Sequence, residues 1–318
     1  MAGPQKTLSL LLAMAVMFIS FSYWEIEIPM KFMHGVRSVN GTMSLQSSRE
    51  DTQIGMQPSN VADGCLHVYV DAGTNRGVQI RKLFEPDKYP KAPFTSFFQK
   101  SFGNESEIRK NVCVFGFEPD PTFTESLSML ESCYKSKGWR TEIYTETGVG
   151  PENTQTTFYV DNTPLHLGSS FIARHGRTAR KVMVPIIDFK EFLTMLSERK
   201  LPSRDGSIEP RMLMKVDVEA TEYSIMHALV NSGLICMFDE VYVEWHTQFF
   251  SKQIFLKQNS SLFSPFSNPS VAQNYAESYE KETKTNATQK CGRQVLADLD
   301  DETYGKDRDK RLPCLSGQ

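Results

Sequence analysis

Short apolar runs with the length of buried strands alternate along the chain with segments whose apolar residues recur every three or four positions. The strand-like runs are 66–70, 112–117, 140–144, 212–216 and 241–243. The helix-like segments are 78–83, 120–138, 188–196 and 217–233. This alternation predicts an α/β domain in which helices cover both faces of a mostly parallel sheet.

Other stretches interrupt this alternation. The weaker elements are two strands or a hairpin, a polar helix and a closing strand, at 156–160, 181–185, 272–285 and 294–299. Residues 84–110 are rich in Pro, Phe and Ser, and residues 247–290 contain a stretch rich in Ser, Phe and Asn. We interpret both as insertions, and we expect 84–110 to lie at the surface rather than in the core.

The N-terminal segment Thr7–Trp24 contains eighteen residues without a charge. A helix of this length spans about 27 Å, close to the thickness of a bilayer core. Lys6 precedes it and Glu25 follows it, so the positive-inside bias predicts a single-pass type II anchor whose following domain lies in the lumen of the Golgi or endoplasmic reticulum. A cleaved signal peptide with an apolar core at 8–19 is the main alternative, and a buried helix of a soluble protein is a third.

Under the anchor interpretation the chain divides into five parts. They are a cytoplasmic tail (1–6), a transmembrane signal-anchor (7–24), a polar stem (25–63), a folded domain (64–300) and a C-terminal tail (301–318). Four N-glycosylation sequons, at Asn40, Asn104, Asn259 and Asn286, agree with a luminal domain.

Net charge and cysteine content limit the kinds of partner and metal site that we expect. The net charge of −3 does not suggest the basic surface that nucleic-acid binding requires, so we expect no nucleic-acid partner. The six cysteines lack C-x-x-C metal spacing, whereas an oxidising lumen permits disulfides. Cys113 lies within a predicted strand, and we expect it to be buried, with an unpaired thiol left open. We assign no metal ligands, and whether a metal assists stays open.

The stretch 65–77 carries the first sign of chemistry. Its apolar run ends at Asp71, and Gly73 and Gly77 follow. Glycines at the end of a buried parallel strand let the backbone approach a bound nucleotide, and the acid can accept hydrogen bonds from it. The spacing Asp71-x-Gly73-x-x-x-Gly77 differs from the G-x-G-x-x-G of dinucleotide-binding folds and suits S-adenosylmethionine better.

Four blocks at predicted strand ends occur in a consistent order. They are VDAGTNRG (70–77), FEPDP (117–121), MKVDVEATE (214–222) and, more weakly, VYVEWH (241–246). Together they resemble the FkbM family of S-adenosylmethionine-dependent methyltransferases over about residues 65–246. The resemblance implies a Rossmann-like class I methyltransferase fold, with a seven-stranded mostly parallel sheet whose last strand is antiparallel.

The resemblance also implies a cofactor, S-adenosyl-L-methionine, across the carboxyl ends of the strands. The residues that it places beside the cofactor are Asp71, Gly73, Thr74, Asn75, Gly77, Glu118, Pro119 and Asp217. Asp217 and Glu219 match the family's acid pair near the donor methyl group. Glu244 and His246 follow the next strand, so we expect all four side chains to take part in catalysis. Lys215, in a buried strand, is expected to pair with a nearby acid.

Three functions compete. The first is a secretory-pathway O-methyltransferase that acts on a hydroxyl of a glycan or small molecule. The second is a luminal glycosyltransferase that uses Asp217-Val-Glu219 as an acidic metal motif. The third is a non-catalytic FkbM-like membrane protein with a role in trafficking or interaction. We favour the first, because the glycine turn has no function in the second and the retained acids argue against the third; oligomeric state stays open.

Overall fold

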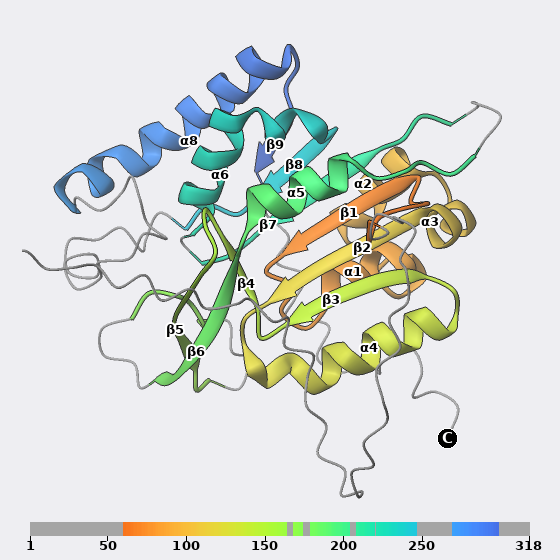
Figure 1. Cartoon of the computed structure of the whole chain (residues 1–318), viewed down its shortest axis with the longest axis horizontal. Coiled ribbons are helices and arrows are strands. Elements are labelled where there is room, and N and C mark those ends of the chain that lie inside the picture. Colours follow the sequence, from red (N-terminus) through yellow and green to blue (C-terminus); the bar gives the residue numbers. More distant parts are fainter. Residues whose placement is uncertain are drawn as a thin grey trace, which may run out of the picture. The chain divides into compact units, whose positions relative to one another are not determined.

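The structure is a computed structural model that describes residues 60–163, 168–173, 179–203, 208–219, 221–246 and 269–298 (Figure 1). The strands are β1 (His67–Ala72), β2 (Val112–Glu118), β3 (Arg140–Thr145), β4 (Gly148–Gly150), β5 (Thr154–Asp161), β6 (Ala179–Asp188), β7 (Met212–Val216), β8 (Glu240–Val243) and β9 (Leu296–Asp298). The helices are α1 (Val78–Phe84), α2 (Pro93–Phe102), α3 (Glu105–Asn111), α4 (Thr124–Ser136), α5 (Phe189–Ser197), α6 (Glu222–Ser232) and α8 (Pro269–Cys291). Short 3₁₀ turns occur at Pro86–Lys88, Pro121–Phe123 and Leu234–Met237.

The main sheet has six strands in the order β3-β2-β1-β7-β8-β9, and every pairing in it is parallel. The α/β class and the parallel sheet are confirmed, and the arrangement is compatible with a Rossmann-like fold. The described residues contain no antiparallel seventh strand in this sheet. Instead β9 pairs parallel with β8 and follows α8 in the chain, as in a crossover connection, which returns a chain in its original direction.

Helices cover both faces of the sheet, as predicted. Side chains of a strand alternate between its two faces. Val68, Val70 and Ala72 of β1 therefore pack in a core shared with α5, α6 and α8, whereas Tyr69 packs in a core shared with α1 to α4. On the second face, Asp71 has Gly116 of β2 on one side and Lys215 of β7 on the other. The fold thus places two ionisable side chains on adjacent central strands.

Residues 84–110 do not form the surface insertion that we expected. They contain α2 and α3, and Phe94, Phe98, Phe102 and Ile108 are buried in the core with α1 and α4. Three of these phenylalanines lie four residues apart, which is the spacing of one helix face. The Pro and Ser content of the segment hid that spacing. The segment belongs to one of the two helical layers.

The folded unit begins earlier than the predicted stem boundary. Ala62 is fully buried, and Gly64 N donates to Lys200 O over 2.7 Å, so residues 60–63 pack on the domain. The predicted anchor, cytoplasmic tail, most of the stem, residues 247–268 and the tail 301–318 lie outside the described residues. No helix among the residues that the structure describes is long and apolar enough to cross a membrane.

β5 and β6 form the predicted hairpin-like pair, and β4 joins them in a separate three-stranded sheet. β6 leads directly into α5, and Asp188 caps that helix by accepting hydrogen bonds from the backbone N–H groups of Lys190 and Glu191. The predicted helix start at Asp188 is confirmed. The predicted start at 217 is not: α6 begins at Glu222, because Glu219 has a positive φ of 53° that no helix accommodates.

Two disulfides lie wholly within the described residues, one between the segment before β1 and β2 and one between the 3₁₀ turn Leu234–Met237 and α8. Cys65 is bonded to Cys113, and Cys236 is bonded to Cys291 at the end of α8. Cys113 is buried as expected, but its thiol is not unpaired. α8 includes the predicted polar helix at 272–285 and extends beyond it, and its residue Ala287 is fully buried. The second half of the predicted insertion is thus a layer of the domain.

Candidate functional site

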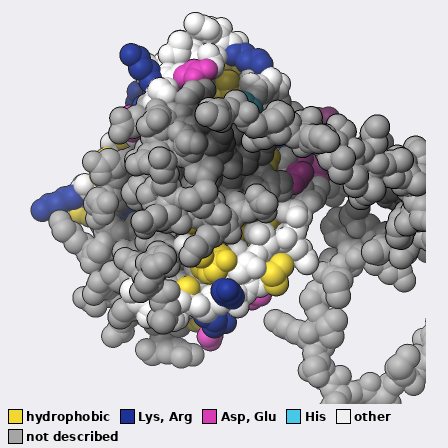
Figure 2. Space-filling view, turned by 90° about the vertical axis from the view of Figure 1, so that its left-hand side faces the viewer, with side chains coloured by type: hydrophobic (Ala, Val, Ile, Leu, Met, Phe, Trp, Pro, Cys, Tyr) yellow, Lys and Arg dark blue, Asp and Glu magenta, His cyan; other side chains and the backbone are white. Residues whose placement is uncertain are grey.

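The predicted site residues lie at the carboxyl edge of the central strands, the side toward which β1, β2 and β3 point in Figure 1. The strand order places the switch point of the sheet here, because the chain runs outward from β1 to β2 and β3 on one side and continues with β7 and β8 on the other. Ligands of open α/β sheets bind in the crevice outside the carboxyl ends at this point. Figure 2 looks onto this side, where the described acidic and basic side chains are interspersed.

Asp71 is fully buried and held from two sides. Its Oδ1 accepts a hydrogen bond from Tyr69 Oη over 3.3 Å and lies 3.7 Å from Lys215 Nζ. Lys215 also donates to the Gly73 carbonyl over 2.6 Å and lies 3.1 Å from Asp217 Oδ2, so the expected pairing is confirmed. Burial raises the pKa of Asp71 to about 6, although Lys215 opposes the shift. The other oxygen, Oδ2, is buried without a hydrogen-bond partner within the described protein.

Close protein contacts fix the turn after β1. A Cβ at Gly73 would lie 1.8 Å from the carbonyl oxygen of Asp217, and the φ of Gly73 is +86°. A Cβ at Gly77, with a φ of +76°, would lie 2.5 Å from the side chain of Leu130. Thr74 closes the turn by donating its hydroxyl to Asp71 O. Protein contacts alone therefore require glycine at both positions, and the role of the glycines toward a nucleotide stays a prediction.

Glu118 ends β2 and is tied to the same turn. Its Oε2 accepts the backbone N–H of Asn75 over 2.5 Å, and its Oε1 accepts that of Asp120 over 2.8 Å. Burial raises the pKa of Glu118 to about 8, against the lowering effect of these two hydrogen bonds. Pro119 is half-buried between the two acids. Asn75 has a φ of 50°, and its side-chain Oδ1 is buried without a hydrogen-bond partner in the described part of the chain.

Asp71, Asn75, Glu118 and Lys215 are called the buried set below. Lys215 lowers the pKa of both Asp71 and Glu118, so the two carboxyls share one cation. Two oxygen acceptors of the set, Asp71 Oδ2 and Asn75 Oδ1, have no hydrogen-bond partner among the residues that the structure describes. A ligand that donates N–H or O–H groups would satisfy them, and the ammonium and ribose hydroxyls of S-adenosylmethionine are such donors. The residues present thus fit that cofactor in chemistry.

The four predicted catalytic residues lie together. Asp217 and Glu219 follow β7, and Glu244 and His246 follow β8. His246 Nε2 lies 3.8 Å from Asp217 Oδ1, 3.7 Å from Glu219 Oε1 and 3.7 Å from Glu244 Oε1. We call these four residues the histidine cluster. They converge because β7 and β8 are parallel neighbours, so their carboxyl ends meet at one edge.

His246 is buried, and its second ring nitrogen faces another acid that the sequence analysis did not assign. Nδ1 lies 3.3 Å from Oε1 of Glu222, which is fully buried, and the same oxygen accepts the His246 backbone N–H over 2.7 Å. Burial lowers the pKa of His246, but Glu222, Glu219 and Asp217 outweigh it and raise the value to about 10. Glu222 closes the third sequence block, and its position at the start of α6 was the available signal.

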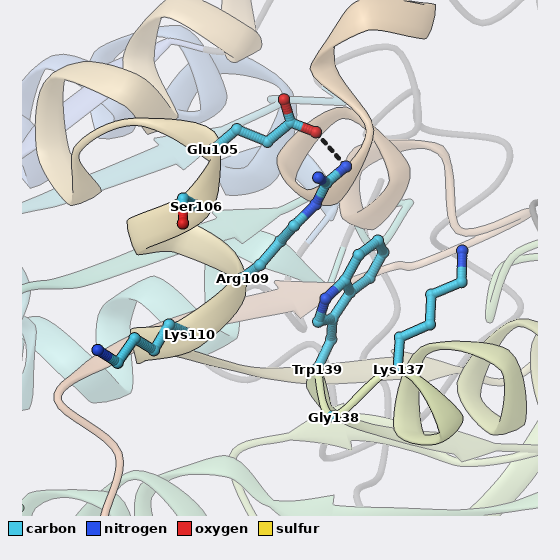
Figure 3. Close-up of a pocket in the computed structure, with 7 residues that line it drawn as sticks. All are labelled: Glu105, Ser106, Arg109, Lys110, Lys137, Gly138 and Trp139. Carbon is cyan, nitrogen blue, oxygen red and sulfur yellow. Dashed lines mark ion pairs between the residues drawn. The ribbon is translucent and has the colours of Figure 1, made fainter.

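A separate hollow of about 430 Å³ lies at the opposite, amino edge of β2 and β3 (Figure 3). Arg109 and Lys137 approach the ring of Trp139, at 4.6 Å and 4.9 Å from its centroid, and Arg109 pairs with Glu105. None of the predicted site residues lines this hollow.

Comparisons with protein-family models, with curated proteins and with solved structures return no match. The family resemblance therefore stays a proposal that depends on the site itself.

Proposed function

We propose that this chain is an S-adenosylmethionine-dependent O-methyltransferase with a class I, Rossmann-like fold. The proposal depends on one observation: Asp71 Oδ2 and Asn75 Oδ1 are buried at the switch point of the sheet and have no hydrogen-bond partner within the described residues. An unsatisfied buried polar group costs about 1–3 kcal/mol, so such atoms are rarely left without a partner. A cofactor with ammonium and ribose donors accounts for both.

The surroundings of these atoms support the same cofactor. Glu118 lies one strand away with both oxygens already accepting backbone N–H groups, so its position is fixed before any ligand arrives. Each of those oxygens retains a further lone pair for a ribose hydroxyl. Preorganised acceptors of this kind reduce the entropy cost of binding a flexible nucleoside.

The histidine cluster supports a role in handling the acceptor. S-adenosylmethionine supplies an electrophilic methyl group, so the protein must align an acceptor hydroxyl and take up its proton. Glu244 is the most exposed member of the cluster, with 40% of its side chain accessible, and it lies beside His246. We therefore infer that the acceptor, a hydroxyl of a glycan or small molecule, approaches on the Glu244 side.

The proposed compartment is the secretory lumen, with the N-terminal segment as anchor. Two disulfides among the described residues, Cys65–Cys113 and Cys236–Cys291, support this proposal, since disulfides persist in oxidising compartments. Of the four sequons, Asn104 and Asn286 lie among the described residues, and both are exposed. Exposure is the condition for carrying a glycan in the folded protein.

Calorimetry on the purified full chain tests the proposal. We expect micromolar binding of S-adenosylmethionine and about tenfold weaker binding by Asn75→Gly, because this change removes the unsatisfied oxygen and tolerates the positive φ. Glu118→Gln should weaken binding further, whereas Glu142→Gln, at an exposed carboxyl of β3, should bind as the wild type does. Absence of cofactor binding by the wild type would contradict the proposal.

The glycosyltransferase alternative keeps one supporting observation, since Asp217 and Glu219 lie together with His246 in an arrangement that could hold a metal ion. The same experiment separates the candidates. Manganese-dependent binding of a nucleoside diphosphate, without binding of S-adenosylmethionine, would favour this alternative. Binding of neither ligand would favour the non-catalytic membrane protein.

A further inference from the structure

The histidine cluster brings three metal-ligand atoms of two types, carboxylate oxygen and imidazole nitrogen, to one point. One oxygen each of Asp217 and Glu219 and one ring nitrogen of His246 lie within 4.8 Å of one another. Two ligands of one divalent cation, each bonded at about 2.0–2.2 Å, are separated by about 3.0–3.5 Å. The 3.7 Å and 3.8 Å separations from His246 Nε2 need only a small contraction to reach this range.

The second ring nitrogen of His246 strengthens the case. A histidine that binds a metal usually donates its other N–H to a carboxylate or carbonyl, which fixes the tautomer and the ring orientation. Here Nδ1 faces Oε1 of the fully buried Glu222 over 3.3 Å. A cation that displaces the Nε2 proton would leave the Nδ1 proton facing Glu222 and the Nε2 lone pair directed toward Asp217 and Glu219. This contact is independent of the acids that would bind the ion.

The exposure of the two acids and the fixed position of Asp217 also suit a bound metal ion. The side chains of Asp217 and Glu219 are each 22% exposed, so an ion can enter and keep bound water, while His246 is buried. Asp217 is further fixed by Lys215, which lies 3.1 Å from its Oδ2 and leaves Oδ1 on the side of His246. Imidazole nitrogen and carboxylate oxygen together suit first-row divalent ions such as Mn²⁺ and Zn²⁺.

We propose that Asp217, Glu219 and His246 bind one divalent transition-metal cation. The site as such needs only these residues, but its role in the reaction depends on the proposed methyltransferase function. In that role the cation would supply a Lewis acid that binds the acceptor hydroxyl oxygen and lowers the pKa of that hydroxyl. Glu244, beside the site and 40% exposed, takes the hydroxyl proton and passes it to water.

The transfer step balances without a further reactant. A bond forms between the acceptor oxygen and the methyl carbon, and the bond between that carbon and the sulfonium sulfur breaks. The electron pair of the broken bond stays on sulfur, which loses its positive charge, and the proton leaves through Glu244. The products are the methyl ether and S-adenosylhomocysteine.

The test uses the full chain stripped of metal by dialysis against EDTA, with no S-adenosylmethionine present. We expect one Mn²⁺ site by calorimetry and by electron paramagnetic resonance, with a nitrogen coupling from the imidazole of His246. His246→Gln should remove that coupling and weaken Mn²⁺ binding about 10–100-fold, and Glu219→Gln should weaken binding by at least about tenfold. Zn²⁺ is titrated in parallel.

The matched control is His227→Gln, since His227 lies on α6 outside the cluster. Thermal unfolding shows that each variant is folded, and Glu219→Gln, in a partly exposed loop, keeps the test valid if His246→Gln does not fold. Absence of a Mn²⁺ or Zn²⁺ site in the wild type, or full binding by Glu219→Gln, would overturn the inference and leave His246 as the cation of an ion-pair cluster. The same samples are titrated with S-adenosylmethionine. If the chain binds S-adenosylmethionine but neither Mn²⁺ nor Zn²⁺, only this inference fails. If it binds metal but no S-adenosylmethionine, only the proposed function fails.

Discussion

The buried set and the histidine cluster lie at the same edge of one sheet but are held in different ways. In the buried set, Glu118 accepts two backbone N–H groups, and the turn that supplies one of them is fixed by glycine packing. In the histidine cluster, Asp217, Glu219 and Glu244 approach His246 through side chains at 3.7–3.8 Å. A backbone-held site is shaped before its ligand binds, whereas side-chain carboxylates around one imidazole can rearrange around an ion.

Asp217 joins the two regions. Its Oδ2 lies 3.1 Å from Lys215 of the buried set, its Oδ1 faces His246, and its backbone carbonyl packs against Gly73. A substitution in the buried set can therefore affect the histidine cluster through Asp217, and the reverse holds as well. The predictions below separate the two regions and test this connection.

The largest effect is expected from Lys215→Met. This change removes from fully buried Asp71 the cation that the described structure places beside it, and loss of one partner of a buried ion pair costs about 3–5 kcal/mol. Denaturant unfolding should show this loss. The double variant Asp71→Asn/Lys215→Met should recover part of it, because the buried charge is then absent.

A surface pair provides the control for that loss. Lys190 lies 3.6 Å from Asp188 and is 39% exposed, so Lys190→Met should cost less than about 1 kcal/mol. Equal costs at Lys190 and Lys215 would contradict the view that the buried set depends on its one cation.

The second prediction concerns the turn that both regions contact. Gly73→Ala places a Cβ 1.8 Å from Asp217 O at a φ of +86°, so we expect a loss of about 2–5 kcal/mol from backbone strain and overpacking. Gly138 has a φ of +77° with open space around it, and Gly138→Ala should cost only about 1–2 kcal/mol. Thermal unfolding of the two variants measures the difference, and similar values would show that φ alone requires glycine at position 73.

The sequence predicted the strands that position the buried set and the histidine cluster. Apolar runs located β1, β2, β3, β7 and β8, and since the ends of parallel strands meet at one edge, the four members of the histidine cluster could be expected together. The predicted ranges 188–196 and 217–233 also placed one helix start at Asp188 and one helix end at Gly233, as the structure has them. These features depend on residues close in sequence, which is why they were predictable.

Other features depend on contacts that sequence spacing does not reveal. The reason for Gly73 lies 144 positions away, at the carbonyl of Asp217. The pairing of Cys65 with Cys113 requires the adjacency of two strands, and Glu222 meets His246 because β8 returns to the carboxyl edge of the sheet, where α6 begins. The burial of 84–110 was missed because composition outweighed periodicity in that segment.

The third prediction uses the pKa of Glu118, which burial raises from its ordinary value near 4.5 to about 8. The folded protein keeps this proton where the unfolded chain has lost it, so the stabilisation is complete below pH 4.5 and disappears as the pH rises through 8. Between pH 6 and 8, where the contribution of Asp71 fades as its titration is completed, stability should fall by on the order of 1 kcal/mol per pH unit from Glu118.

Comparison of the wild type with Glu118→Gln isolates the contribution of Glu118 to the pH dependence of stability. His246 also makes stability fall as the pH rises, but it does so in both proteins. The variant is less stable at every pH, since its amide N–H₂ faces a backbone donor, but its slope between pH 6 and 8 should be smaller. An unchanged slope would mean that Glu118 is ionised throughout, as a fully solvated carboxyl would be.

The smallest effect on stability is expected at Glu244, and the same variant tests whether Glu244 is a metal ligand. Its side chain is 40% exposed and lies 3.7 Å from His246, so Glu244→Gln should change the unfolding free energy by less than about 0.5 kcal/mol. If Asp217, Glu219 and His246 are the ligands, Mn²⁺ binding should weaken by less than about threefold in this variant, against at least about tenfold for Glu219→Gln. Transfer to an acceptor should nevertheless fall by about 100-fold or more, the usual contribution of a general base. A loss of Mn²⁺ affinity equal to that of Glu219→Gln would instead make Glu244 a fourth ligand and move the proton acceptor elsewhere.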